Sequence, residues 1–404
     1  MDGAFETVVD HLNLKGIPAE LLSLYIHIPF CRTLCSYCAF NTYAGMGALV
    51  EPYLHTLLRE MEMVGRAAGG ARSHSLYFGG GTPSLLSAGQ VRRVITAAQA
   101  ALGLRGGGEI TLEANPGTVD LEKLQAYRAA GVNRLSLGVQ SAHAGELRLF
   151  ARRHTFADAA QAFALARRAG FDDVSVDLIY GAPQQTLVSW GQTLDAVLAW
   201  QPDHVSLYAL TLEPGTSLKR RVERGRLPAP DDDLAADMYE LARAKLQAAG
   251  LGHYEISNWA RPEHESRHNR QYWLNRPFLG FGAGAHGAAA GLRYWNVNPI
   301  QAYTARIDAG EGRPFPLSPA VEGCEEIGTA LEMSETVILG LRLAGEGVRR
   351  AVAVLLLDEI SDGLSQQAQV GKGEGLGNHG APAVCAEADG HAASWCVVVG
   401  YAAG

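Results

Sequence analysis

Three cysteines stand within the run CRTLCSYC, from Cys31 to Cys38. Three thiolates can bind three irons of a cubane cluster and leave the fourth iron open to another ligand. A structural zinc site would need a fourth ligand at a regular spacing, and the nearest candidates are His27 before the run and the distant Cys324. The spacing therefore predicts a [4Fe–4S] cluster on Cys31, Cys35 and Cys38, with structural zinc as the weaker alternative.

Composition places the chain among ordinary globular proteins. Its 404 residues are 47% hydrophobic, and the formal net charge is −8. That charge disfavours binding through phosphate attraction, so no nucleic-acid partner is expected. Residues 1–20 carry acids and no long apolar run, and no later stretch is apolar enough to span a bilayer. Three of the six cysteines fall close together, unlike a secreted disulfide framework, so we expect a cytoplasmic protein.

Short apolar runs alternate with helical stretches over the first half of the chain. Residues 121–130 and 156–170, for example, repeat apolar side chains at helical spacing. This alternation is typical of βαβ units around a parallel sheet, which can close into a barrel or stay open as a doubly wound sheet. In α/β barrels the carboxyl ends of the strands build the active site. The expected strands cover residues 23–29, 75–78, 109–116, 134–141, 173–183 and 204–214.

Several of these expected strands end in residues that can bind a ligand. The GGGTP run at residues 79–83 allows close backbone approach, so that its amides can meet polar groups. Glu113 can accept hydrogen bonds from hydroxyls or cap a helix. Arg152 can clamp a carboxylate with two hydrogen bonds, and Arg153 is the neighbour that could take this role instead. Asp177 stands within an apolar strand, where an unpaired charge is costly, so we expect it to point into the site.

The cysteine run lies within YIHIPFCRTLCSYCAF, residues 25–40, which resembles the radical S-adenosylmethionine (SAM) signature. More narrowly, about residues 21–345 resemble the coproporphyrinogen III dehydrogenase (HemN)-like family, with several motifs in the family's order. The resemblance implies an α/β fold, with a radical SAM partial (β/α)6 barrel and a smaller C-terminal α+β region. It also implies that the open iron of the cluster chelates SAM, and that an electron from the cluster cleaves SAM to methionine and a 5′-deoxyadenosyl radical.

The same resemblance assigns SAM binding to the residues at the strand ends. It implies that the GGGTP run cradles the SAM amino group and that Glu113 binds the ribose hydroxyls. It places Arg152 at the SAM carboxylate and Tyr37 against the adenine. The full set of SAM-binding residues that it implies is Tyr25, Tyr37, Gly80, Gly81, Thr82, Glu113, Gln140, Arg152, Asp177 and, as a weaker assignment, Thr211.

A later run, HNRQYW at residues 268–273, matches the HNxxYW motif associated with heme handling in the HemW-like branch of that family. His268 could be an axial ligand of heme iron, with Tyr272 and Trp273 packing on the macrocycle. A single histidine is more often structural, and aromatic residues often only fill a core, so that alternative stays open. His286, in the run FLGFGAGAHG, is a second and weaker ligand candidate.

Position 40 distinguishes the branches of the family. The dehydrogenase signature continues to a further cysteine, where this chain has Phe40. The dehydrogenase also has a longer N-terminal extension, and here the signature begins only 24 residues into the chain. Both features favour the heme-chaperone branch, whose implied role is to bind heme as cargo and transfer it to acceptor apo-proteins.

The resemblance further implies an electron donor protein, and an acceptor that could be membrane-associated. The alternatives are an oxygen-independent coproporphyrinogen III oxidase and a radical SAM methyltransferase on the same scaffold. We assign no catalytic residue and leave open whether the chain is an enzyme.

Changes in composition and periodicity along the sequence predict four regions. The last of them is rich in glycine and alanine, lacks clear periodicity and adds two cysteines, so we expect it to be disordered or the product of a frame shift. The regions are an N-terminal segment over residues 1–20, the barrel core over 21–250, a HemN/HemW-like C-terminal region over 251–347 and the atypical tail over 348–404.

Overall fold

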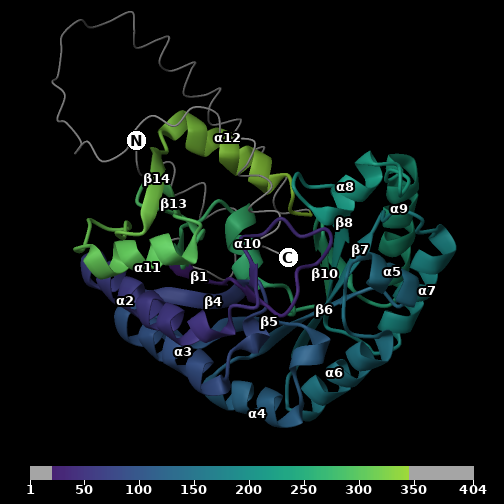
Figure 1. The fold of residues 1–404 in the computed structure, drawn as a ribbon, viewed down its shortest axis with the longest axis horizontal. Coiled ribbons are helices and arrows are strands. Elements are labelled where there is room, and N and C mark those ends of the chain that lie inside the picture. Colours follow the sequence, from purple (N-terminus) through teal and green to yellow (C-terminus); the bar gives the residue numbers. More distant parts are fainter. Residues whose placement is uncertain (1–20, 345–404) are drawn as a thin grey trace, which may run out of the picture.

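A computed structural model describes residues 21–344 of the chain. The expected N-terminal segment, residues 1–20, and the expected tail, residues 348–404, lie outside the described residues. Within them, strands and helices alternate as the sequence predicts, and Figure 1 shows helices ranged along the outer side of a curved sheet.

Six parallel strands form the centre of this sheet, and each coincides with one of the six predicted apolar runs. Strands covered on both faces bury nearly all their side chains, and the LSLYIHI run of the first strand is buried throughout. The strands lie side by side in chain order, with Tyr25 aligned to Tyr77 in the neighbouring strand. They are β1 (Leu22–Ile28), β4 (Ser73–Gly80), β5 (Leu104–Ala114), β6 (Arg134–Gln140), β7 (Asp173–Tyr180) and β8 (His204–Ala209).

Helices connect these strands and cover the sheet's outer face. Side chains that accept hydrogen bonds from the first turn define several of their starts: α3, α6 and α7 each begin with a capping box, at Ser87, Thr155 and Thr186 respectively. None of the helices within residues 21–344 combines the length and apolar character needed to cross a membrane. The helices are α2 (Val50–Ala68), α3 (Ala88–Leu102), α4 (Leu121–Ala130), α6 (Phe156–Arg168), α7 (Leu187–Leu198) and α9 (Asp232–Ala248).

The strands after residue 250 extend the same sheet at both of its edges. At one edge β10 (Asn258–Ala260) pairs antiparallel with β8 and then with β9 (Gly252–Glu255). At the other edge β11 (Phe278–Phe281) runs parallel to β1. The antiparallel strands β12 (His286–Ala289), β13 (Leu292–Asn296) and β14 (Val321–Glu326) follow, and α10 (Arg267–Trp273), α11 (Ile300–Ala309) and α12 (Thr329–Gly340) pack beside them. The α/β fold class is confirmed.

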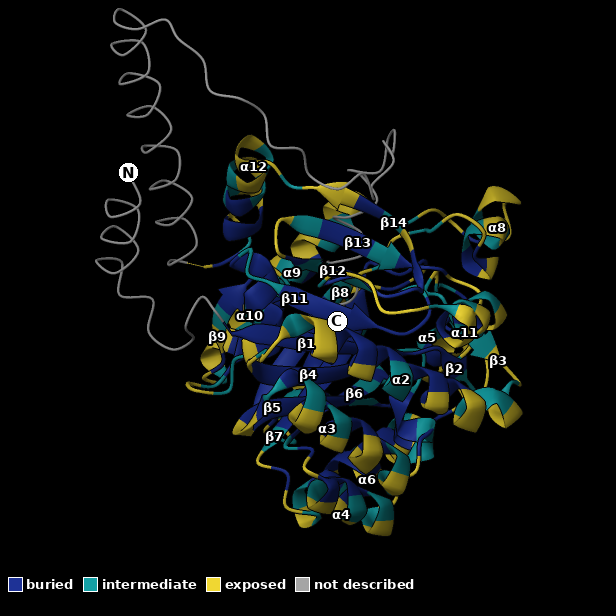
Figure 2. Cartoon of the chain, turned by 90° about the vertical axis from the view of Figure 1, so that its left-hand side faces the viewer, coloured by how far each residue is buried: buried dark blue, intermediate teal, exposed yellow. Residues whose placement is uncertain are grey.

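A buried carboxylate, that of Glu60 on α2, fastens the C-terminal elements to the barrel. It accepts hydrogen bonds from the backbone N–H of Gly282 at 2.9 Å and from Asn296 Nδ2 at 2.8 Å. It also accepts from the hydroxyls of Tyr303 and Ser318, each at 2.7 Å. Figure 2 shows that the central strands are buried while exposed residues lie on the outer sides of the helices. Four donors make this buried carboxylate tolerable, and they tie α2 to β13 and α11.

Candidate functional site

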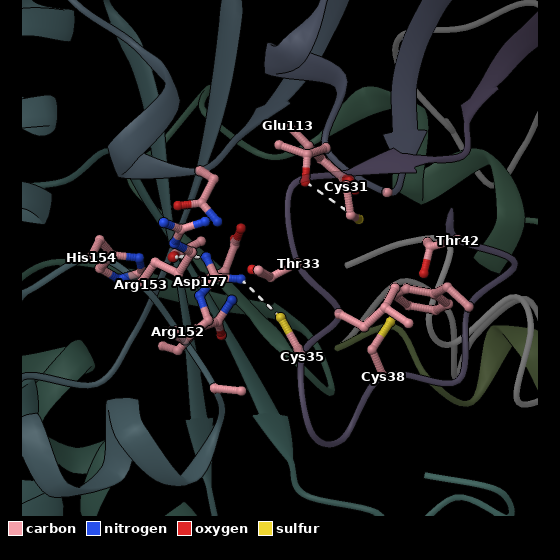
Figure 3. Close-up of a pocket in the computed structure, with 18 of the residues that line it drawn as sticks. Cys31, Thr33, Cys35, Cys38, Thr42, Glu113, Arg152, Arg153, His154 and Asp177 are labelled. Atoms are coloured by element: carbon pink, nitrogen blue, oxygen red, sulfur yellow. Dashed lines mark hydrogen bonds between the residues drawn. The ribbon is translucent and has the colours of Figure 1, made fainter. Parts of the chain in front are cut away.

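One cavity of about 450 Å³ opens at the carboxyl ends of the parallel strands. The loops after β1, β4, β5 and β6 supply most of its lining, as the barrel architecture predicts. Figure 3 shows the cysteine loop on one side of the cavity and Arg152, Arg153 and Asp177 on the other. Of the predicted site residues, those that line it are Cys31, Cys35, Tyr37, Cys38, Gly80, Gly81, Thr82, Glu113, Gln140, Arg152 and Asp177.

The cysteine loop is held in place chiefly by Ser36. Its hydroxyl donates to the carbonyl of Leu149 at 2.6 Å, and its N–H donates to the carbonyl of Phe150 at 3.1 Å. The carbonyl of Ser36 accepts from the N–H of Leu218 at 2.8 Å. The ring of Tyr37 packs edge-on against Phe150, with ring centroids 5.5 Å apart. Segments distant in the sequence therefore fix the loop that carries all three thiols.

Arg152 and Thr82 offer hydrogen bonds to the thiols, whereas burial opposes ionisation of Cys31 and Cys38. Arg152 lies across the cavity, with Nη1 3.5 Å from Cys35 Sγ, while its Nη2 donates to the carbonyl of Gly138 at 2.7 Å. The Thr82 hydroxyl lies 3.6 Å from Cys31 Sγ and can donate to it. Burial raises the pKa of Cys31 and raises that of Cys38 to about 12. Thiols must lose their protons to bind a metal; Arg152 favours the thiolate form of Cys31, and the charge of a bound metal would favour it further.

The GGGTP turn does not offer its amides to a ligand, which corrects the interpretation from the sequence. The N–H of Gly81 donates to the carbonyl of Ile28 at 2.9 Å, and the N–H of Thr82 donates to that of Phe30 at 2.8 Å. A Cβ on Gly81 would lie 2.7 Å from the Phe30 oxygen, so glycine is needed for this close approach. The N–H of Gly80 donates to the carboxylate of Glu113. The turn therefore braces the start of the cysteine loop and Glu113.

Two carboxylates line the cavity below the thiols. Glu113 accepts a hydrogen bond of 2.9 Å from the hydroxyl of Tyr77. Burial, and secondarily the charge of Asp177, raise the pKa of Glu113 to about 8. Asp177 accepts from the Ser136 hydroxyl at 2.8 and 2.9 Å, and burial raises its pKa to about 6. Asp177 thus points into the site, as its place in an apolar strand predicts.

The cavity fits a polar ligand beside a metal cluster. Cys31, Cys35 and Cys38 all line it, and three thiolates are the donor set of a cluster with one open iron. Gln140 Oε1 and Arg152 Nε are buried there without a hydrogen-bond partner among residues 21–344. Buried polar atoms are nearly always paired, so an acceptor and a donor are both available to a bound molecule.

Three predicted residues lie elsewhere. Tyr25 is buried beneath the cavity, with its hydroxyl 3.1 Å from Nδ1 of His27, and Thr211 is exposed beyond the lining. His268 is fully buried at 0% exposure. Its Nδ1 is 2.9 Å from the Ser75 hydroxyl and its Nε2 is 2.9 Å from the Tyr272 hydroxyl. Both ring nitrogens are therefore engaged in this conformation, and ligation of heme iron by His268 stays a prediction that would require one of these bonds to break.

The sequence reading missed Tyr77, Ser136 and Tyr208. Ser136 and Tyr208 line the cavity, and Tyr77 supports Glu113 from below. The signal for Ser136 and Tyr208 is strand alternation, because side chains two residues apart face the same side. Ser136 precedes Gly138 and Gln140 on one face of β6, and Tyr208 follows Ser206 on β8. No local sequence pattern marks Tyr77, because its role depends on its hydrogen bond to Glu113 on the neighbouring strand β5.

The raised pKa of Glu113 predicts a pH-dependent cost in stability. Glutamate ordinarily titrates at 4.5, so between pH 4.5 and about 8 the folded protein retains a proton that the unfolded chain has lost. The retained proton stabilises the folded protein fully below pH 4.5, and this stabilisation is lost as the pH rises through about 8. Glu113→Gln should therefore raise Tm relative to the parent by a few degrees more at about pH 9 than at about pH 5. Calorimetry at both pH values measures this; a pH-independent difference, or the same trend in the exposed control Glu122→Gln, would contradict it.

Comparison with known proteins adds independent evidence. Residues 25–197 match the radical SAM superfamily. The heme chaperone HemW of Mycobacterium tuberculosis (strain ATCC 25618 / H37Rv) is 40% identical over 334 residues, which cover 82% of this chain and 84% of that protein. HemW of Bacillus subtilis (strain 168) is 38% identical over 321 residues, covering 79% and 83%.

Among solved structures, coproporphyrinogen III oxidase (HemN) from Escherichia coli, described as a radical SAM enzyme, superimposes with a TM-score of 0.71 at 26% identity. The superposition covers 90% of this chain and 86% of that one. The family resemblance predicted from the sequence is confirmed. This chain belongs to the radical SAM superfamily and, within it, to the HemN-like family that includes the HemW proteins.

Proposed function

We propose that this protein is a heme chaperone that holds a [4Fe–4S] cluster on Cys31, Cys35 and Cys38, binds SAM beside it and transfers heme to acceptor apo-proteins. The observation that supports it best is that the three cysteines, Arg152 and Glu113 all line one cavity. That cavity belongs to a chain 40% identical over 334 residues to a protein named heme chaperone HemW.

The polar groups around the cavity suit the parts of SAM. The carboxylate of Glu113 can accept from ribose hydroxyls, and the Arg152 guanidinium can pair with the SAM carboxylate. Gly80 and Gly81 line the cavity beside Cys31, where a backbone carbonyl of these glycines could accept from the SAM amino group. When bound, the cluster and SAM would supply reductive cleavage of SAM.

Heme enters the proposal as cargo, and Phe40 supports this branch of the family. Phe40 lines the cavity two residues after Cys38, where the dehydrogenase signature has a further cysteine. An apolar ring at this position removes a thiol from the immediate surroundings of the cluster. The proposed partners are heme, an acceptor apo-protein that could be membrane-associated, and an electron donor protein. The proposed location is the cytoplasm.

A second candidate is an oxygen-independent coproporphyrinogen III oxidase, which the TM-score of 0.71 with HemN favours. The two candidates share the cluster and the SAM pocket, and they differ in what is done with the porphyrin. Phe40 and the identity to HemW favour the chaperone.

The cluster assignment predicts the iron content. Anaerobic reconstitution should give about four irons per chain, because three thiolates with one open position suit a [4Fe–4S] cube. Cys35→Ala should lose most of the iron and the broad visible absorbance, whereas Cys324→Ala on β14 should retain both. Iron analysis of the triple variant at positions 31, 35 and 38 decides the matter, and full iron content there would refute the assignment.

The chaperone proposal predicts heme binding without porphyrinogen conversion. Heme titration into the reconstituted protein should give a saturable Soret shift, and the bound heme should pass to an apo-protein acceptor. With SAM and a reductant, coproporphyrinogen III should remain unconverted when assayed by chromatography. Steady formation of protoporphyrinogen would instead establish the oxidase, and absence of a saturable Soret shift would remove the chaperone role.

A further inference from the structure

The HNRQYW helix, α10, is anchored under the SAM pocket by the carboxylate of Glu109 on β5. Glu109 Oε1 accepts from the N–H of His268 at 2.8 Å, and Oε2 accepts from the N–H of Arg267 at 2.9 Å. Glu113 follows Glu109 by four residues on the same strand, so both side chains lie on one face of β5. The start of α10 is thereby fixed to the strand that supplies a carboxylate to the pocket.

The His268 ring is fixed in orientation by two hydroxyls. Its Nδ1 is 2.9 Å from Ser75 Oγ on β4, and its Nε2 is 2.9 Å from the hydroxyl of Tyr272, one turn along α10. Hydrogen bonds at both nitrogens leave the ring no rotational freedom. Burial lowers the pKa of His268 to about 3, so the imidazole is neutral and can donate only from one nitrogen.

Tyr77 connects this histidine to the pocket. It lies two residues after Ser75 on β4, and its ring stacks on the His268 ring, with centroids 5.1 Å apart and planes inclined by 28°. The Tyr77 hydroxyl donates to Glu113 Oε1 at 2.9 Å. On the neighbouring strand β1 the ring of Tyr25 stacks against that of Tyr77, with centroids 6.2 Å apart. The His268 ring therefore supports one face of the Tyr77 ring, whose hydroxyl bonds to the Glu113 carboxylate.

We infer that His268 is a positioning residue of the SAM pocket, acting through Tyr77 on Glu113. Ligation of iron by His268 would require the bond to Ser75 or to Tyr272 to break, and it would move the surface on which Tyr77 rests. The inference rests on SAM binding at Glu113, and it does not require that heme be bound. It gives the HNRQYW run a role in this chain that the geometry supports directly.

A double-mutant cycle on SAM affinity tests the inference. SAM binding to the cluster-loaded protein is measured by equilibrium dialysis. Tyr77→Phe keeps the stacked ring and removes the hydroxyl; His268→Ala removes the stacking surface. Each should weaken SAM binding roughly fivefold to tenfold, the effect of one lost hydrogen bond. The double variant should be no more than about twofold weaker than the weaker single one, because both changes act through the same bond. His268→Phe restores a ring under Tyr77 and should recover part of the affinity.

Tyr303→Phe is the matched control. It also removes a tyrosine hydroxyl that donates to a buried glutamate, Glu60, and neither residue lines the cavity. It should lower Tm as Tyr77→Phe does and leave SAM affinity unchanged. If Tyr303→Phe weakens SAM binding equally, or if the effects of Tyr77→Phe and His268→Ala are additive, the inference is overturned. Should His268→Ala fail to fold, unchanged SAM affinity in Tyr77→Phe alone overturns it.

Heme titration separates this role from iron ligation. A positioning role predicts that His268→Ala loses SAM affinity whether or not heme is present. A lost Soret shift with unchanged SAM affinity would overturn the inference and make His268 the ligand. A parent protein that binds no SAM, or a Glu113→Ala variant with unchanged SAM affinity, would instead refute the proposed SAM site, on which the inference depends.

Discussion

Carboxylates withdrawn from water need donors, and this requirement organises the interior of the barrel. Glu60, Glu113 and Asp177 are surrounded by hydroxyls, amides and backbone N–H groups from neighbouring strands and helices. An uncompensated buried charge costs more than any one packing contact contributes, so the side chains that supply donors are as constrained as the carboxylates. Burial still raises the pKa values of Glu113 and Asp177, to about 8 and about 6. The pocket therefore holds carboxylates that a bound ligand's donors would stabilise further.

The same requirement explains why elements after residue 250 pack against the inner side of the curved sheet. Two buried serine–histidine–tyrosine sets lie inside it, each near one of the cavity carboxylates. One joins Ser75, His268 and Tyr272 below Glu113. The other joins Ser175, His204 and Tyr254 near Asp177, with His204 2.7 Å from the Ser175 hydroxyl and 2.8 Å from that of Tyr254. Tyr272 comes from α10 and Tyr254 from β9, so C-terminal elements complete the polar interior from both ends of the parallel sheet.

The cysteine loop, by contrast, is held in place by backbone groups of residues that are distant in the sequence. Its thiols have few donors of their own, and burial raises the pKa of Cys31 and Cys38. The loop keeps its shape because Ser36 forms hydrogen bonds with residues 149, 150 and 218. The N–H groups of the GGGTP turn also donate to the carbonyls of Ile28 and Phe30, just before the loop. A metal cluster would add the positive charge that the thiolates need. The scaffold thus presents the ligands in place, and their ionisation depends on the metal.

Sequence alone determined most strands and helices and indicated the candidate chemistry of the cysteine loop, because both are carried by local patterns. Apolar runs with helical stretches between them predict the six parallel strands, and the spacing of Cys31, Cys35 and Cys38 predicts a cluster site beside SAM ligands. What the sequence could not decide was the partner of each polar group, since hydrogen bonds between distant residues leave no local pattern. In the folded chain the N–H groups of Gly81 and Thr82 donate to the carbonyls of Ile28 and Phe30, just before the cysteine loop. Tyr77 lies between Glu113 and a fully buried His268. The role of a histidine depends on which atoms face its two nitrogens, and only the folded chain brings those atoms together.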